Sequence, residues 1–360
     1  MGIYTHVQFI NIVAKREELW EDFDHVNERP FLKPEEKFFD DIFDFMKRII
    51  FSVAQTFPIE PPPSVLKVFS FSEFFMQPHL RAYSIEILPL FFGRMSAVLK
   101  DCEKNVDGYV INFRNVLFIF GTLPITFETP SGEYNVVENV SPIIYCDETS
   151  QTFPKIVYKE FFASEDYFSP RETEKEPTVR RIHGEQMISR RLDPTRPPPN
   201  YESLRTEENA DDPIDFQSLA KVSTPLQTAS DNLYGRGVFF FPNMLNPAGR
   251  PICLAIEICL DHLVARLKKA RFAAQMPIDF HIVISHGINK LDSDNIIANF
   301  GGYAVLVEGQ VKISQVLQIL KSQNQISKNC LKNIEAKFVT PLETCKIYVY
   351  PPLPLLSTLF

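Results

Sequence analysis

Apolar and polar residues alternate with period two in several short segments, and this pattern predicts β-strands. The alternation is clearest after Pro251, where every second residue from Leu254 to Leu260 is aliphatic while Glu257 and Cys259 fall on the opposite face. One face of this strand is therefore expected to pack in a core, and the other to carry a carboxylate and a thiol. Similar patterns predict strands at 5–13, 65–71, 134–137, 142–145, 156–159, 237–241, 280–285, 303–307 and 347–350, within 109–122 and near 338.

Apolar residues recur at helical spacing in other segments. We expect helices at 35–55, 88–100, from 261 to about 273, at 295–300 and at 313–322. Strands and helices thus alternate along the chain, which predicts an α/β layered fold. Residues 169–236 differ, since they carry charges of both signs and several prolines with almost no apolar periodicity. We interpret 169–236 as a long irregular insertion that is disordered, forms a lid or binds a partner.

Composition narrows the classes of function. The 360 residues are 45% hydrophobic and 12% aromatic, enough for a large core, and the formal net charge is -8. Such a chain lacks the basic field that nucleic acid or an anionic membrane attracts, so a small molecule or a protein is the expected partner. The N-terminal residues do not resemble a secretory signal and no apolar stretch reaches transmembrane length, so we expect a cytoplasmic protein with its six cysteines reduced.

Cys259 lies where a predicted strand runs into a predicted helix. A thiol near a helix N-terminus is easier to ionise, because the helix dipole and the unpaired N–H groups favour negative charge. The alternative is that Cys259 fills space in the core, as most free cysteines do. Two other predicted strands end in a similar way, one at Glu73 and one at Lys159. A thiol, a carboxylate and an ammonium group together could carry out nucleophilic catalysis.

The order of these three residues resembles the nitrilase superfamily, whose carbon–nitrogen hydrolases use Glu, Lys and Cys in that chain order. Residues 71–73 (Phe-Ser-Glu) are similar to the family's F-P-E motif, 158–159 (Tyr-Lys) to its lysine motif, and 255–261 (Ala-Ile-Glu-Ile-Cys-Leu-Asp) to its cysteine motif. Serine replaces the usual proline in the first motif, and alanine replaces the usual glycine in the third. Residues 119–121 and 134–135 also match the family's pattern, whereas no segment of the sequence can be recognised as its R-A-x-E-N helix.

The resemblance implies a single carbon–nitrogen hydrolase domain over 1–360, folded as a four-layer α-β-β-α sandwich without a cofactor. It also implies a homo-dimer. Cys259 would attack the carbon of a small-molecule amide to give a thioester, and Glu73 would act as general base and acid. Lys159 would stabilise the oxyanion together with the backbone N–H of Leu260. An amide is favoured over a nitrile because amide hydrolysis is the commoner activity in the family.

Three further residues have two interpretations each, and a fourth has one expected role. Glu165 is either the second glutamate that many family members place after the lysine or part of a solvated turn. Glu257 is either a supporting carboxylate or a salt-bridged strand residue, and His286 either lines the pocket or lies in an ordinary turn. Asp261 is expected to cap or brace the cysteine helix.

Two other kinds of site or function are possible. Cys253, Cys259 and His262 could be imagined around zinc, but the spacing suggests no fourth ligand, so we expect no metal. The alternative function is a catalytically inactive nitrilase-like binding or scaffold protein that recognises a macromolecule. Against this alternative, a charged lysine and glutamate at buried strand ends are costly unless they are used.

Overall fold

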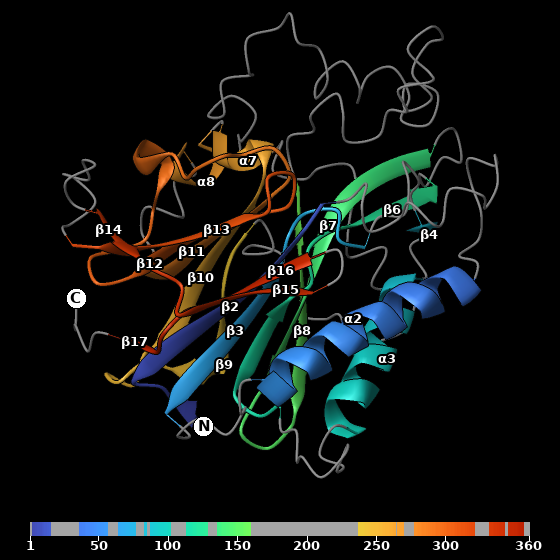
Figure 1. The fold of residues 1–360 in the computed structure, drawn as a ribbon, viewed down its shortest axis with the longest axis horizontal. Helices are drawn as coiled ribbons and strands as arrows, with labels where there is room; N and C mark the ends of the chain where they lie inside the picture. The colour runs from blue at the N-terminus through green and yellow to red at the C-terminus, as the bar shows by residue number, and fades with distance from the viewer. Residues whose placement is uncertain are drawn as a thin grey trace, which may run out of the picture.

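The fold was examined in a computed structural model. It describes residues 2–15, 36–56, 64–76, 83–84, 87–101, 113–128, 135–159, 237–263, 265–269, 277–320, 331–342 and 345–355. The predicted insertion at 169–236 and Glu165 lie outside these ranges. Two β-sheets organise the described residues (Figure 1).

The first sheet, sheet A, has seven strands and carries Cys259 at the end of one of them. Its three central strands β10, β11 and β12 are parallel, β1 pairs parallel with β9, and the remaining pairs are antiparallel. The strands follow the order β1 (Gly2–Ile3), β9 (Val238–Leu245), β10 (Pro251–Ile258), β11 (Ile278–Ser285), β12 (Tyr303–Glu308), β13 (Ile313–Ile319) and β14 (Leu331–Ile334).

The second sheet, sheet B, has ten strands and carries Glu73 and Lys159. Strands β2, β3 and β5 are parallel, as are β4 and β6, and the other pairs are antiparallel. Eight strands follow the order β15 (Phe338–Leu342), β16 (Cys345–Val349), β2 (His6–Ala14), β3 (Val65–Phe71), β5 (Val116–Ile119), β7 (Asn135–Cys146), β6 (Leu123–Glu128) and β4 (Tyr83–Ser84). In addition, β17 (Leu353–Pro354) pairs with β2 and β8 (Thr152–Tyr158) pairs with β7.

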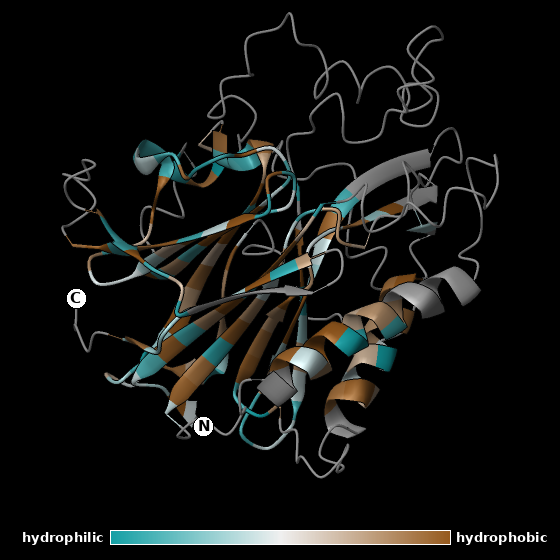
Figure 2. Cartoon of the chain, in the orientation of Figure 1, coloured by the Kyte–Doolittle hydropathy of each residue, from teal (hydrophilic) through white to brown (hydrophobic). Residues whose placement is uncertain are grey.

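The main hydrophobic core lies between the two sheets. Phe9 of β2 meets Phe280 of β11 edge to face with ring centroids 5.5 Å apart, and it contacts Tyr303 of β12 at 5.9 Å. All three rings are fully or almost fully buried. The strands are accordingly mostly hydrophobic along their length (Figure 2). Burial of apolar surface on this scale is the main force that holds one sheet against the other.

A second core lies on the other face of sheet B. There the helices α2 (Glu36–Thr56) and α3 (Ile87–Asp101) cover the sheet with apolar side chains (Figure 1). Phe91 of α3, for example, packs edge to face on Phe120 at a centroid distance of 5.1 Å. The result is a layer of helices, then sheet B, then sheet A. Next to sheet A lie two single-turn helices, α7 (Leu260–Leu263) and α8 (Arg266–Lys269).

The α/β class agrees with the sequence, but three predicted helices were wrong. Residues 313–319 form strand β13, because both of its neighbours, β12 and β14, pair with its backbone. Ile313, Val316 and Leu317 fit helical spacing, and the pairing overrides this local pattern. The predicted helix at 295–300 is reduced to one 3₁₀ turn at Ser293–Asn295. The predicted helix after Cys259 is interrupted at Ala265, whose φ of 58° is left-handed.

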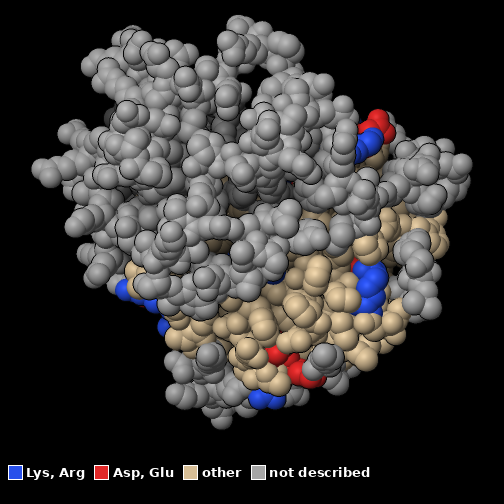
Figure 3. Space-filling model, turned by 180° about the vertical axis from the view of Figure 1, so that it is seen from behind, with Lys and Arg blue, Asp and Glu red and all other residues tan. Residues whose placement is uncertain are grey.

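Charge and hydropathy of the described residues add two observations. No described helix has an apolar stretch long enough to cross a bilayer. Seen from behind, the described surface is largely uncharged, with Lys, Arg, Asp and Glu side chains scattered over it (Figure 3).

Candidate active site

Glu73 lies in a tight turn directly after β3. The next residue, Phe74, has a φ of 60°, and its N–H donates a hydrogen bond of 2.9 Å to Thr122 Oγ1. Gly121 lies against the same turn with a φ of 69°, and a Cβ on it would be 2.3 Å from the carbonyl oxygen of Ser72. Only glycine allows this approach without strain. Gly121 therefore helps to fix the turn that carries Glu73.

Glu73 and Lys159 form an ion pair that is completely buried. Lys159 Nζ lies 2.9 Å from Glu73 Oε1, and both side chains have 0% exposure. Lys159 directly follows β8, where its N–H donates to the carbonyl oxygen of Asn139 on β7 at 2.8 Å. Asn139 Nδ2 donates to Glu73 Oε1 at 3.2 Å, and the backbone N–H of His286 donates to Glu73 Oε2 at 3.1 Å. The carboxylate is thus held by three donors, which is what a buried charge requires.

Cys259 follows β10 in a strained conformation. Its φ is 48°, an uncommon value for a residue with a side chain, and it costs about 1–3 kcal/mol. The backbone is held on both sides, since Cys259 N–H donates to Ile284 O and His262 N–H donates to Cys259 O, each at 2.9 Å. Strain of this kind persists where surrounding contacts enforce it, and it is concentrated at functional sites.

His286 connects Cys259 to Glu73 through its main chain. Its carbonyl oxygen accepts a long hydrogen bond of 3.8 Å from the Cys259 thiol, while its N–H binds Glu73. Its ring lies 5.6 Å from that of Phe74, and Lys159 Nζ lies 5.8 Å from the centre of the Phe74 ring. The structure therefore brings the three predicted residues Glu73, Lys159 and Cys259 around His286, although they come from different sheets.

Glu308 holds the turn in which His286 lies. Its fully buried carboxylate accepts the N–H groups of Gly287 and Ile288, at 2.8 and 2.9 Å, and that of Gln310 at 2.7 Å. These bonds fix the backbone on the C-terminal side of His286. The sequence reasoning missed this role because Glu308 resembles any other acidic residue at the end of a strand.

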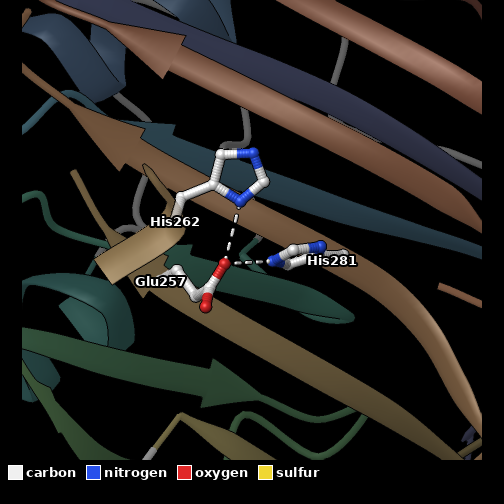
Figure 4. Close-up of side chains that lie close together, drawn as sticks. All are labelled: Glu257, His262 and His281. Atoms are coloured by element: carbon white, nitrogen blue, oxygen red, sulfur yellow. Dashed lines mark hydrogen bonds and ion pairs between the residues drawn. The ribbon is translucent and has the colours of Figure 1, made fainter. Parts of the chain in front are cut away.

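Glu257, on the strand that leads to Cys259, binds two histidines (Figure 4). Glu257 Oε2 lies 2.9 Å from both His262 Nδ1 and His281 Nε2, and its Oε1 accepts the N–H of Leu267 at 2.8 Å. All three charged or polar side chains have 0% exposure. Burial by itself raises the pKa of Glu257, but the hydrogen bonds from His262 and His281 outweigh burial and lower that pKa to about 2. Glu257 is thus a buried, hydrogen-bonded carboxylate on the strand that leads to Cys259.

The same three residues form a group of possible metal ligands, with ligand atoms within 4.8 Å of one another. Hydrogen bonds from the backbone decide whether a metal fits. His262 Nε2 accepts the N–H of Asp292 at 3.2 Å, and His281 Nδ1 accepts the N–H of Ile297 at 3.3 Å. In a metal-bound histidine the outer nitrogen carries a proton and donates. If a metal bound here, the outer nitrogen of each histidine would carry a proton that points at a backbone N–H, so that two donors would face each other. The arrangement therefore does not suit a metal.

The zinc set considered from the sequence has no better support. Within the described ranges, Cys253, Cys259 and His262 do not come together as a group of possible metal ligands. Cys253 belongs instead to a group at the start of β10, where its N–H donates to Asp279. Within the described ranges, Cys146, Cys253, Cys259 and Cys345 do not form disulfides.

The remaining predicted residues lie on α7 and α8. Leu260, the expected oxyanion donor, is the first residue of α7 and is partly buried. Asp261 is fully buried with its Oδ2 3.7 Å from Arg266 Nη1, which fits the predicted bracing role. Because α7 has only four residues, it is not the long helix whose dipole the sequence predicted beside Cys259.

The chain matches no protein-family model and no curated protein.

Proposed function

We propose that the protein is a cofactor-independent carbon–nitrogen hydrolase that cleaves a small, non-peptide amide through a thioester on Cys259. The observation that carries this proposal is the buried Glu73–Lys159 ion pair, which is linked through the backbone of His286 to a cysteine in a strained turn. A buried ion pair contributes little net stability, since desolvation offsets most of the attraction. A catalytic role explains why the chain keeps this pair beside a thiol.

The reaction has two halves. Cys259 transfers its proton to Glu73 and its sulfur attacks the amide carbon, so that a C–S bond forms and the carbonyl oxygen becomes an oxyanion. Lys159 and the N–H of Leu260 stabilise this oxyanion. The C–N bond then breaks, the leaving amine takes the proton from Glu73, and the thioester remains. Water, deprotonated by Glu73, attacks the thioester and releases the acid and the thiol.

The proposal includes the finer fold expected from the sequence, the nitrilase-like α-β-β-α sandwich. Helices α2 and α3 on sheet B would form one outer layer, and the elements after β10 would belong to the other. This proposal also includes a homo-dimer, which light scattering after size-exclusion chromatography would test.

Alkylation of the cysteines tests the proposal directly. With substoichiometric iodoacetamide at pH 7 and peptide mass spectrometry, Cys259 is expected to react faster than Cys253, whose thiol is kept protonated by burial. Glu73→Gln should slow the labelling of Cys259 and leave that of Cys345 unchanged. Incubation with an amide library should then add an acyl mass to Cys259, and Cys259→Ala should abolish both the adduct and turnover.

Two results would overturn the proposal. One is labelling of Cys259 no faster than that of Cys253 and insensitive to Glu73→Gln. The other is turnover that survives Cys259→Ala. The first result would favour the alternative function, a catalytically inactive binding or scaffold protein.

A further inference from the structure

We propose that Glu257, His262 and His281 form a metal-free clamp that positions Cys259, with Glu257 ionised and both imidazole rings neutral. The inference rests on the proposed function, because it concerns a nucleophile. The three residues act through the backbone of Cys259 and are positioning residues rather than catalytic ones.

The clamp joins the chain on the two sides of Cys259. Glu257 is the second residue before Cys259 and lies on β10, while His262 is the third residue after it and lies on α7. The carboxylate of Glu257 binds the His262 ring at 2.9 Å and the N–H of Leu267, at the start of α8, at 2.8 Å. One side chain therefore ties the segment after Cys259 to the strand before it.

His281 anchors this clamp to the neighbouring strand. In the register of the parallel pair, His281 of β11 is opposite Ala255 of β10, so it lies diagonally next to Glu257 on the same face. Its Nε2 reaches Glu257 Oε2 at 2.9 Å. The same strand β11 ends immediately before His286, the residue whose backbone binds both Glu73 and Cys259. The clamp therefore joins the two strands that hold the thiol and its contact.

Hydrogen bonds determine the protonation state of both rings. Because His262 Nε2 and His281 Nδ1 each accept a backbone N–H, each ring carries its proton on the nitrogen that faces Glu257. Burial lowers the pKa of His281 from 6.5, so this ring is neutral at pH 7. The N–H protons of both rings then point at one oxygen of the Glu257 carboxylate, and every polar atom of the three side chains has a partner.

Cys259 needs such a clamp because little regular structure holds its turn. The two helices after it have four residues each, and Ala265 between them is left-handed. Isolated helical turns of this length are not stable by themselves. A Cys259 backbone at a φ of 48° therefore depends on side-chain contacts such as those of Glu257.

The test compares variants that break the clamp with variants that keep its geometry. Glu257→Gln and His281→Leu break the clamp. His281→Gln keeps a donor at the position of Nε2, and His262→Asn keeps one at the position of Nδ1, but neither can take up a proton. Asp279→Asn is the matched control, because it removes a carboxylate from the other end of β11, where Asp279 binds Arg250 at 2.7 Å.

The readout is the rate of Cys259 alkylation as a function of pH, with the urea midpoint measured in parallel. Breaking the clamp is expected to slow alkylation at pH 7 about ten- to a hundredfold. It should also move the pH profile towards that of an ordinary thiol near pH 8.5. His281→Gln and His262→Asn should retain the wild-type profile. Asp279→Asn should lower the urea midpoint without changing the profile.

The outcomes separate the clamp from the proposed function. If wild-type Cys259 is not more reactive than Cys253, the proposed function fails and the positioning role fails with it. If Cys259 is reactive but Glu257→Gln and His281→Leu keep its profile, only the clamp is refuted. Should the two clamp-breaking variants not fold, a changed profile in His281→Gln and His262→Asn would refute it instead. The last outcome comes from isothermal titration calorimetry with zinc. Stoichiometric zinc binding to the wild type that is abolished in His281→Gln would overturn the metal-free state.

Discussion

Breaking the buried ion pair gives the sharpest prediction. Glu73→Gln leaves the Lys159 ammonium, which has 0% exposure, without the carboxylate that lies 2.9 Å away. Loss of one partner of a buried pair costs about 3–5 kcal/mol in the free energy of unfolding, because the other charge stays in a medium of low dielectric constant. We expect a loss of this size for Glu73→Gln.

The double variant Glu73→Gln/Lys159→Met should recover much of that loss. Methionine removes the uncompensated charge, and the glutamine keeps an acceptor for the N–H of His286. The Asn139 amide can turn to accept from this glutamine, since its Oδ1 has no hydrogen-bond partner among the described residues. We therefore expect the double variant to be more stable than Glu73→Gln by at least about 2 kcal/mol.

Urea denaturation at pH 7, followed by far-ultraviolet circular dichroism, measures these differences. The control is Asp44→Asn, which breaks the exposed pair of Lys47 and Asp44 on α2 at 4.0 Å and should change stability by less than about 0.5 kcal/mol. Additive effects of the two substitutions would refute the reasoning, as would a loss for Glu73→Gln no larger than that of the control. Cys259 alkylation should slow in the double variant although stability returns.

The remaining predictions concern the turns and the clamp. Gly121→Ala places a Cβ 2.3 Å from Ser72 O at a φ of 69° and should cost about 2–4 kcal/mol in urea denaturation, whereas an unchanged midpoint would contradict the close approach. Glu308→Ala leaves the N–H groups of Gly287 and Gln310 without their acceptor, and leaves that of Ile288 with Ser285 Oγ alone. It should therefore cost about 2–5 kcal/mol and slow Cys259 alkylation, and full stability would count against the role given to this carboxylate. In the folded chain the pKa of His281 is lowered from 6.5, and that of Glu257 is lowered from 4.5 to about 2. As the pH falls, the unfolded chain therefore binds a proton at each of these residues at a higher pH than the folded chain does. Stability should therefore fall as the pH drops below 6.5 and fall further below 4.5. His281→Gln should reduce the first of these losses in urea midpoints measured between pH 7 and pH 3, and an unaltered pH dependence would show that His281 does not contribute to it.

The sequence predicted the strands that end at Glu73, Lys159 and Cys259 because each has a clear apolar period and a charged or reactive residue at its exit. It could not predict β13, since Ile313, Val316 and Leu317 fit helical spacing and only the pairing with neighbouring strands overrides this local pattern. The meeting of His281 with Glu257 depends on the register between β10 and β11, which local sequence does not encode. His286 contributes its main chain to the site, and every residue type has a main chain, so no residue pattern could reveal that role.

Cys259 comes from sheet A, whereas Glu73 and Lys159 come from sheet B. His286 follows β11 of sheet A, so its contact with the Cys259 thiol lies within that sheet, whereas its contact with Glu73 exists only after the two sheets have packed together. A nascent chain, or one whose sheets have separated, would carry an ordinary cysteine with no special reactivity. The chemistry would thus be acquired with tertiary structure and lost with it. The labelling rate of Cys259 would then report the fraction of molecules in which the two sheets are docked.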